Sequence, residues 1–157
     1  MNQDYVIRLA DVTFIDSCVE IMQDSELGRT YFGDRGKAYD MLSYAVAKNN
    51  VYVALDENGE CLGFIYYMTK GVFGSYPYLH IIAVREEYRG HGIGRQLIRF
   101  FEDNASDQPS AKFFLTVDDF NPRAKMLYES LGYKCVVDLP DLYKQGIDCY
   151  LMMKCRG

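Results

Sequence analysis

The stretch that decides the fold runs from Tyr78 to Phe101 and reads YLHIIAVREEYRGHGIGRQLIRFF. Its first seven residues form a nearly continuous apolar run, which predicts a central strand buried on both faces. Its last part places apolar side chains at Ile93, Leu97 and the two following phenylalanines, so one face of a helix reaching about Asn104 is apolar. A strand, a turn and an amphipathic helix are therefore expected in that order.

The turn between this strand and this helix is rich in glycine. Its residues are Arg89, Gly90, His91, Gly92, Ile93 and Gly94. Glycine lets the backbone approach a ligand closely, and the first turn of a helix offers unpaired N–H groups and a dipole that favours anions. The turn therefore predicts a phosphorylated ligand, and we expect His91 to face either solvent or the phosphate.

Two other phosphate-binding loops fail on spacing. A dinucleotide-binding loop needs Gly-x-Gly-x-x-Gly near the first strand, whereas this chain has Gly-x-Gly-x-Gly well inside the sequence. A Walker loop needs Gly-Lys followed by Ser or Thr, and the sequence has no such tripeptide. The spacing therefore favours neither a nicotinamide cofactor nor nucleotide hydrolysis.

Composition describes an ordinary globular chain. Its 157 residues predict one domain over residues 1–157, and a formal net charge of −5 argues against a nucleic-acid partner and an anionic membrane surface. No apolar run approaches the ~20 residues of a membrane-spanning helix, and the polar N-terminus shows no signal peptide. We therefore expect no membrane association.

The cysteines and histidines predict no metal site. The five cysteines are scattered and include no Cys-x-x-Cys pair, and neither His80 nor His91 has the spacing of a zinc ligand. Free thiols in a reducing cytoplasm are the simplest account of this pattern.

The flanking sequence predicts a mixed α/β sheet. A strand at residues 5–9 precedes a helix capped by Asp11, and residues 37–48 form a second helix after a glycine-containing loop at 24–36. The remaining expected strands are 51–55 and 62–69, joined as a hairpin through 56–59, then 112–117, 133–137 and 149–154, with breaks at 71–77 and 140–146. Asn121 before Pro122 begins another helix and Gly132 closes it. The total is six to seven strands flanked by about four helices.

These residues resemble a known family. Ala83 and Val84, the turn from Arg89 to Gly94, and Asn121 followed by Ala124 and Tyr128 are similar to the motifs of the GNAT superfamily of acyl-CoA N-acyltransferases. The family pattern Arg/Gln-x-x-Gly-x-Gly/Ala fits at Arg89, Gly92 and Gly94. The order of elements agrees over nearly the whole chain, while the motifs themselves span residues 79–132.

The resemblance implies a set of roles. The CoA pyrophosphate would lie on the amides from Arg89 to Gly94, with the Arg89 side chain adding positive charge, and the backbone of Ile82, Ala83 and Val84 would pair with pantetheine. The Val84 amide would stabilise the oxyanion, and Asn121 would contact the pantetheine arm. Tyr128 would protonate the departing thiolate, although its helical position also suits a core residue.

The general base is less well defined by the sequence. His80 lies on the same face of the strand as Val84, and an imidazole suits removal of a proton from an ammonium group, although a strand histidine without catalytic role fits as well. Family members often use a glutamate on this strand or a chain of waters, and this strand carries no carboxylate. Tyr78 and Tyr150 are further candidates for the pocket.

The resemblance implies a cytoplasmic N-acetyltransferase that moves an acetyl group from acetyl-CoA to a primary amine, without a metal. The acceptor, a small molecule or a peptide or protein amine, is chosen by loops that carry no motif. The alternative is a GNAT-like module that binds CoA or acyl-CoA as a sensor without turnover. The aromatic last strands also allow a homodimer.

Overall fold

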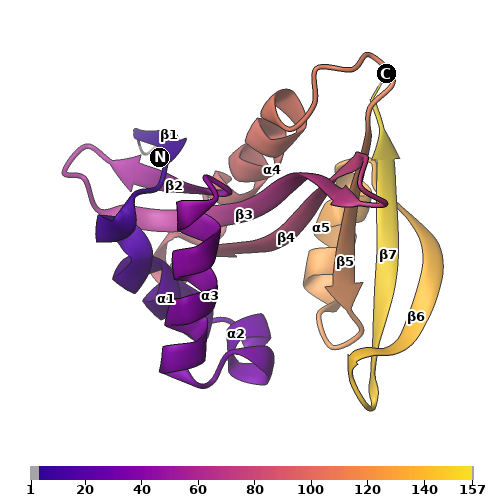
Figure 1. Cartoon of the computed structure of the whole chain (residues 1–157), viewed down its shortest axis with the longest axis horizontal. Helices are drawn as coiled ribbons and strands as arrows, with labels where there is room; N and C mark the ends of the chain where they lie inside the picture. Colours follow the sequence, from indigo (N-terminus) through magenta and orange to yellow (C-terminus); the bar gives the residue numbers. More distant parts are fainter. Residues whose placement is uncertain (1–3, 157) are drawn as a thin grey trace. The chain divides into compact units, whose positions relative to one another are not determined.

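The computed structural model describes residues 4–156 and shows a mixed α/β fold with one seven-stranded sheet (Figure 1). The strand order is β1-β2-β3-β4-β5-β7-β6. The strands are β1 Tyr5–Leu9, β2 Val51–Asp56, β3 Cys61–Val72, β4 Tyr76–Val84, β5 Lys112–Asp118, β6 Lys134–Lys144 and β7 Ile147–Cys155. The helices are α1 Ile15–Gln23, α2 Glu26–Tyr31, α3 Arg35–Ala47, α4 Ile93–Asn104 and α5 Pro122–Ser130, with 3-10 turns at Val12–Phe14 and Glu86–Tyr88.

Contacts divide the chain into two compact units. Unit 1 holds the described residues up to Tyr67 together with Ile81–Phe101, and unit 2 holds Met68–His80 and the described residues from Glu102 onward. Because β3, β4 and α4 each run from one unit into the other, both units consist of separate stretches of sequence.

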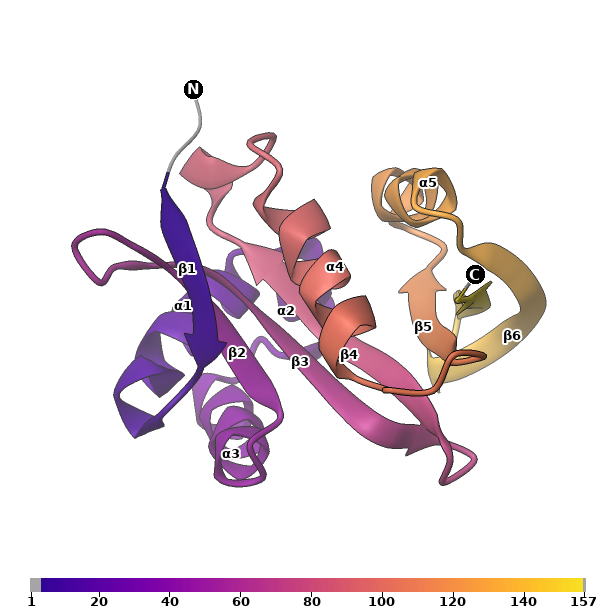
Figure 2. The ribbon, with the colours of Figure 1, turned by 90° about the horizontal axis from the view of Figure 1, so that it is seen from above.

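Unit 1 has three layers. Figure 2 shows α4 on one face of its strands, and α1 and α3 on the opposite face. Rings from α4 pack on the sheet, with the Phe100 centroid 4.8 Å from Tyr52 and the Phe101 centroid 5.1 Å from Tyr67. The apolar stripe predicted for residues 93–104 is therefore the face that α4 buries.

The predicted hairpin of unit 1 is confirmed. Strands β2 and β3 pair antiparallel, and β1 pairs antiparallel with the other edge of β2. The turn is held by the Asp56 carboxylate, which accepts hydrogen bonds from the amides of Asn58 and Glu60 at 2.9 Å each. Gly59 has a φ of 80°, the left-handed backbone that such a turn requires.

One expectation for unit 1 is wrong, because residues 24–36 are not only a loop. Helix α2 lies within them, capped by the Ser25 hydroxyl, which accepts a hydrogen bond from the Gly28 amide at 3.0 Å. Six residues are too few for a readable helical period, and the glycine in the middle hides the helix further. Gly28 is buried against the backbone of Met22, where a Cβ would come within 1.8 Å of the carbonyl oxygen.

Unit 2 is built around β7. Strand β5 pairs in parallel with β4 at Tyr78 and Leu79, and β7 lies antiparallel between β5 and β6. Helix α5 packs near these strands, with the Lys125 ammonium 4.3 Å from the Tyr150 ring centroid. Its end follows the sequence prediction, because Gly132 has a φ of 100°.

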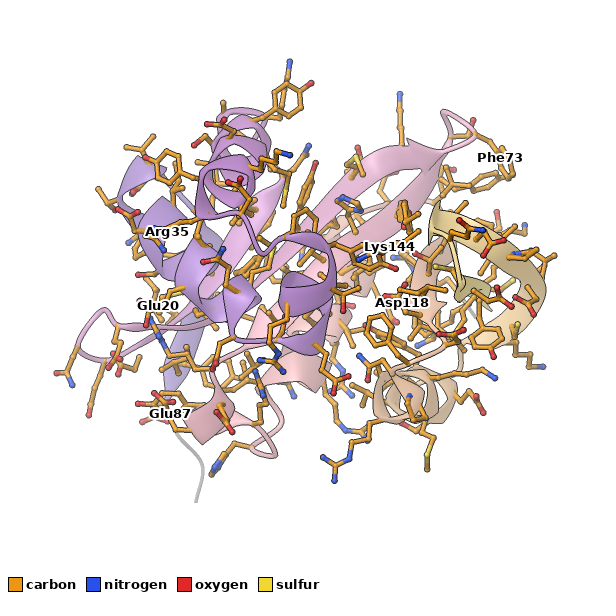
Figure 3. The ribbon with its side chains drawn as sticks, turned by 90° about the horizontal axis from the view of Figure 1, so that it is seen from below. Glu20, Arg35, Phe73, Glu87, Asp118 and Lys144 are labelled. Atoms are coloured by element: carbon orange, nitrogen blue, oxygen red, sulfur yellow. The ribbon has the colours of Figure 1, made fainter. Side chains whose placement is uncertain are left out.

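The ends of the unit 2 strands differ from the predicted ones. Strand β6 continues through Pro140 to Lys144, and its register with β7 shifts between Leu139 and Lys144. As the last strand of the sheet, β6 can accept a proline that a central strand could not. The expected break at 71–77 shrinks to residues 73–75, where Phe73 has a φ of 53° and is 83% exposed (Figure 3).

A charged network holds the later part of unit 2. The Glu102 carboxylate accepts a hydrogen bond from the Tyr133 hydroxyl at 2.9 Å and pairs with the Lys154 ammonium at 2.8 Å. The Arg156 guanidinium donates to the carbonyl oxygens of Ser106 and Gln108. These bonds tie the end of α4 and the loop after it to β7. Among the described residues, no helix has the length and apolar character needed to cross a membrane.

We predict that Gly28→Ala lowers the free energy of unfolding by about 1–3 kcal/mol, because the added methyl group overlaps backbone that cannot rotate away. Gly33→Ala is the matched control, since a Cβ there comes no closer than 3.9 Å to the Arg29 carbonyl oxygen. Urea denaturation of both variants measures the difference. Equal stability of the two variants would show that the close approach at Gly28 is not a real constraint.

Candidate functional site

The glycine turn in unit 1 has the geometry of an open helix N-terminus. Gly90 and Gly92 have φ values of 81° and 87°, so both need the backbone freedom of glycine. A Cβ at Gly94, in the first turn of α4, would meet nothing within 4 Å. The first amides of α4 have no partner within the helix, and Arg95, an exposed residue of the first turn, carries a positive charge. This end of α4 can therefore receive an anion.

At the end of β4, one edge of the strand is hydrogen-bonded to β3, the other strand of its hairpin. The Arg85 amide donates to the Leu62 carbonyl oxygen at 2.8 Å, and a Cβ on Gly63 would lie 2.8 Å from the Ala83 carbonyl oxygen. Backbone groups of successive strand residues point alternately to the two edges. The amides and carbonyls of Ile82 and Val84 therefore point away from β3, while those of Ala83 point toward it.

The Arg89 side chain folds back onto this strand end. Its Nε donates to the Val84 carbonyl oxygen at 2.9 Å, and a terminal nitrogen lies 3.5 Å from the Asp24 carbonyl oxygen. The structure thus brings Arg89 and Val84 together. The guanidinium links the end of β4, the glycine turn and the segment between α1 and α2.

Unit 2 carries Tyr128 and Asn121 on α5. The Asn121 side chain caps this helix, accepting a hydrogen bond from the Ala124 amide at 3.3 Å, so the predicted cap is confirmed. Tyr128 is buried, with its ring centroid 6.1 Å from that of Tyr133. Burial raises the pKa of Tyr128 to about 12, so its phenol keeps its proton at neutral pH.

His80 lies on the unit 2 part of β4. Its ring centroid is 5.7 Å from that of Tyr78, and burial lowers the pKa of His80 below its ordinary value. The imidazole is therefore mostly neutral at pH 7, which is the form that can accept a proton.

Sequence reasoning missed a chain of hydroxyl groups beside His80. The Tyr78 hydroxyl lies 2.9 Å from the Thr116 hydroxyl and 3.3 Å from the Tyr143 hydroxyl. Three strands supply these groups, and burial raises the pKa of Tyr78. The register of parallel β4 with β5 brings them together, and no local pattern in the sequence signals that register.

Asp118, at the end of β5, is buried, and its carboxylate accepts a hydrogen bond from the Cys149 thiol at 3.1 Å. The two residues are direct partners in the antiparallel register of β5 and β7. Among the described residues, no group of three or more His, Cys, Asp and Glu side chains is placed to hold a metal ion.

Unit 1 also contains an open cavity of about 490 Å³ that the sequence did not predict. Its lining is mostly charged: Glu20, Ile21, Gln23, Asp24, Arg35, Arg85 and Glu87. Figure 3 labels three of these side chains, Glu20, Arg35 and Glu87. The Arg85 guanidinium pairs with Glu20 at 3.0 Å, so the charges on this wall are partly compensated.

Comparisons with known proteins agree with this fold and its motifs. The model of the acetyltransferase (GNAT) family matches residues 16–133. A thialysine N-epsilon-acetyltransferase of Sus scrofa is 36% identical over 80 residues, which cover 49% of this chain and 47% of that protein. An N-alpha-acetyltransferase of Sulfurisphaera tokodaii is 28% identical over 161 residues, which cover 96% of this chain and 93% of the relative. The chain spans about half the length of several curated relatives that it matches.

Solved structures are similar over nearly the whole chain. Ard1 from Thermoplasma volcanium superposes with a TM-score of 0.77 at 23% identity, covering 98% of both chains. Arabidopsis thaliana NAA60, solved in complex with a bisubstrate analogue, gives a TM-score of 0.73 at 20% identity, covering 98% of this chain and 99% of that chain. These likenesses establish a shared mixed α/β fold.

A mixed sheet with a glycine turn that opens the helix after its central strand defines a class of mixed α/β folds. Within that class, the chain belongs to the acetyltransferase (GNAT) family.

We predict that Gly92→Ala lowers the free energy of unfolding by about 1–2 kcal/mol, because alanine is strained at a φ of 87°. Gly94→Ala adds the same methyl group in a helical turn with open space, and should leave stability unchanged or raise it by up to about 1 kcal/mol. Chemical denaturation checks both. A neutral Gly92→Ala would mean that the turn can relax to an ordinary backbone.

The lowered pKa of His80 predicts a pH-dependent stability. Below pH about 6.5 the unfolded state binds a proton at His80 that the folded state resists. The contribution of His80 is therefore fully present above that pH and is lost as the pH falls toward the folded pKa. His80→Gln should lose less stability than wild type between pH 7.5 and 5. His91→Gln, at an exposed position, should follow the wild type, and identical curves for all three proteins would contradict the burial of His80.

Proposed function

We propose that this protein is an acetyl-CoA-dependent N-acetyltransferase that acetylates a primary amine by direct attack on the thioester. The observation that carries the proposal is the positive-φ glycine turn that opens α4 directly after β4. Membership of the GNAT family supports the choice of acyl-CoA over other phosphorylated ligands.

The geometry of unit 1 supports a proposal for the cofactor-binding groups. The CoA pyrophosphate would accept hydrogen bonds from the amides of Gly92 to Gly94, assisted by the helix dipole and the positive charge of Arg95. Pantetheine would pair with the edge of β4 that faces away from β3, where Ile82 and Val84 present their backbone groups. Because Arg89 holds the Val84 carbonyl, its main contribution would be to fix this edge.

Acyl transfer needs a neutral amine, a stabilised oxyanion and a protonated leaving group. His80, with its lowered pKa, would take the proton from the incoming ammonium group. The Val84 amide would donate to the oxyanion that forms when the amine attacks the thioester carbonyl. Collapse would break the C–S bond, and Tyr128 would give its proton to the thiolate. Asn121 would position α5 through its cap.

Tyr128→Phe tests the assignment of the acid. Loss of the phenolic proton should lower kcat by about 10²–10⁴-fold with little change in KM, because the hydroxyl acts only as the thiolate leaves. The assay follows free thiol release from acetyl-CoA with a panel of primary amines. Tyr133→Phe is the matched control, since it removes a neighbouring buried hydroxyl whose partner is Glu102, and it should keep full kcat. Unchanged turnover in Tyr128→Phe would remove Tyr128 from the mechanism.

A non-catalytic CoA or acyl-CoA sensor is the competing function, favoured by the lack of a carboxylate on β4. Calorimetry with acetyl-CoA measures binding, and the thiol-release assay with the amine panel measures turnover, so together they distinguish a sensor from an enzyme. Binding without thiol release from any amine would support the sensor.

The acceptor is proposed only as a primary amine on a small molecule, peptide or protein. The relatives are named for different amines: one is a thialysine N-epsilon-acetyltransferase and another is an N-alpha-acetyltransferase. We propose a cytoplasmic location, supported by the five cysteines, all of which are free thiols in the described residues. A homodimer stays a prediction.

A further inference from the structure

Unit 1 buries two thiols against each other. Cys18 lies on α1 and Cys61 is the first residue of β3, and their side chains are 0% and 3% exposed. The Cys18 thiol is hydrogen-bonded to Cys61, and the Cys61 sulfur also lies 3.5 Å from the Gly63 carbonyl oxygen. The two sulfurs are therefore neighbours although they are far apart in sequence, and neither takes part in the proposed acyl transfer.

A half-buried cation, Arg85, lies beside this pair. The Arg85 Nε donates to the Cys61 carbonyl oxygen at 2.8 Å, and the same guanidinium pairs with Glu20 on α1. Arg85 thus bridges the helix that carries one thiol and the strand that carries the other. The hydrogen bond from Cys18 lowers the pKa of Cys61, and the Arg85 charge acts in the same direction.

The two thiols differ in role because they lie at different places in the fold. The Cys61 thiol donates to the Gly63 carbonyl oxygen at 3.5 Å, whereas Cys18 is enclosed on α1 with Cys61 as its neighbour. Cys61 directly follows the exposed turn of the hairpin, so it is the sulfur that an oxidant meets first, and Cys18 is placed to resolve the product.

Cys61 is buried but lies next to an exposed segment of the chain. The residue directly follows the exposed turn at Glu57, Asn58, Gly59 and Glu60, which closes the β2–β3 hairpin. Arg85, which holds the Cys61 carbonyl, also lines the open 490 Å³ cavity described above. An opening confined to the end of the hairpin would expose the Cys61 sulfur to solvent.

We propose that Cys18 and Cys61 are a hydroperoxide-reactive dithiol that closes into a reversible disulfide between α1 and β3. The Cys61 thiol loses its proton and attacks one peroxide oxygen, an S–O bond forms, the O–O bond breaks, and the leaving hydroxide takes up the proton that Cys61 lost to become water. The Cys18 sulfur then attacks Cys61, the S–S bond forms, the S–O bond breaks, and a second water leaves with the Cys18 proton. Two thiols are oxidised and one hydrogen peroxide is reduced to two waters.

The chain provides its own comparison cysteines. Cys149 is fully buried like Cys18, but its thiol donates a hydrogen bond to the Asp118 carboxylate. Burial raises the pKa of Cys149 to about 12. Cys135 and Cys155 are exposed, so they report how far the oxidant has acted on accessible thiols.

The experiment treats the folded protein with hydrogen peroxide, blocks the remaining thiols by alkylation, and maps the peptides by mass spectrometry without reduction. The expected product is a peptide that links Cys18 to Cys61, with the loss of two hydrogen atoms, and dithiothreitol should restore both thiols. Cys149 should escape oxidation and be recovered as an alkylated thiol. The same treatment of a Cys135→Ser, Cys155→Ser variant removes intermolecular disulfides of the exposed thiols.

Two variants in that background sharpen the test. Cys61→Ser should abolish the link, whereas Cys149→Ser should keep it. Should Cys61→Ser fail to fold, the wild-type peptide map decides alone. Absence of the link while Cys135 and Cys155 become oxidised overturns the proposal, and so does a link that forms only in urea. The oxidation is independent of acyl transfer, so either can fail while the other stands.

Discussion

The alternation of backbone groups along β4 is the constraint on which the candidate site depends. Because the Arg85 amide is bound to Leu62 on β3, the groups of Val84 and Ile82 must face the opposite edge. Because Gly63 has no side chain, β3 can approach β4 closely enough for this hydrogen bond to form. The adjacent glycine turn then sets the start of α4, so one strand edge and one helix end are positioned by the same hairpin.

The features that were predicted correctly from the sequence are those determined by residues close together in the chain. The hairpin at Asp56 and Gly59, the apolar stripe of α4 and the Asn121 cap each depend on a few consecutive residues and a known geometry. The motif residues from Arg89 to Gly94 belong to this group, because a strand, a turn and a helix start are local events. The family could therefore be recognised before any tertiary contact was known.

The remaining features come from packing between distant segments. Helix α2 is short and exists because Gly28 allows it to press on the end of α1. The contacts of Tyr78 with Thr116 and of Cys18 with Cys61 join residues on separate elements, and Arg89 turns back onto Val84, five residues earlier, in a side-chain direction that a motif does not specify. A linear pattern can name an arginine as a phosphate ligand, but it cannot show that the carbonyl oxygen at the end of the preceding strand already accepts a hydrogen bond from the guanidinium.

The position of β7 between β5 and β6 has a consequence for synthesis on the ribosome. Every residue of unit 1 has been made once Phe101 is added, whereas β5 and β6 have no strand to join them until Ile147–Cys155 follows. At the usual rate of translation the interval lasts on the order of a few seconds. During that interval β5 lacks its antiparallel partner, so the nascent chain carries an unpaired strand edge that can mispair or attract a chaperone.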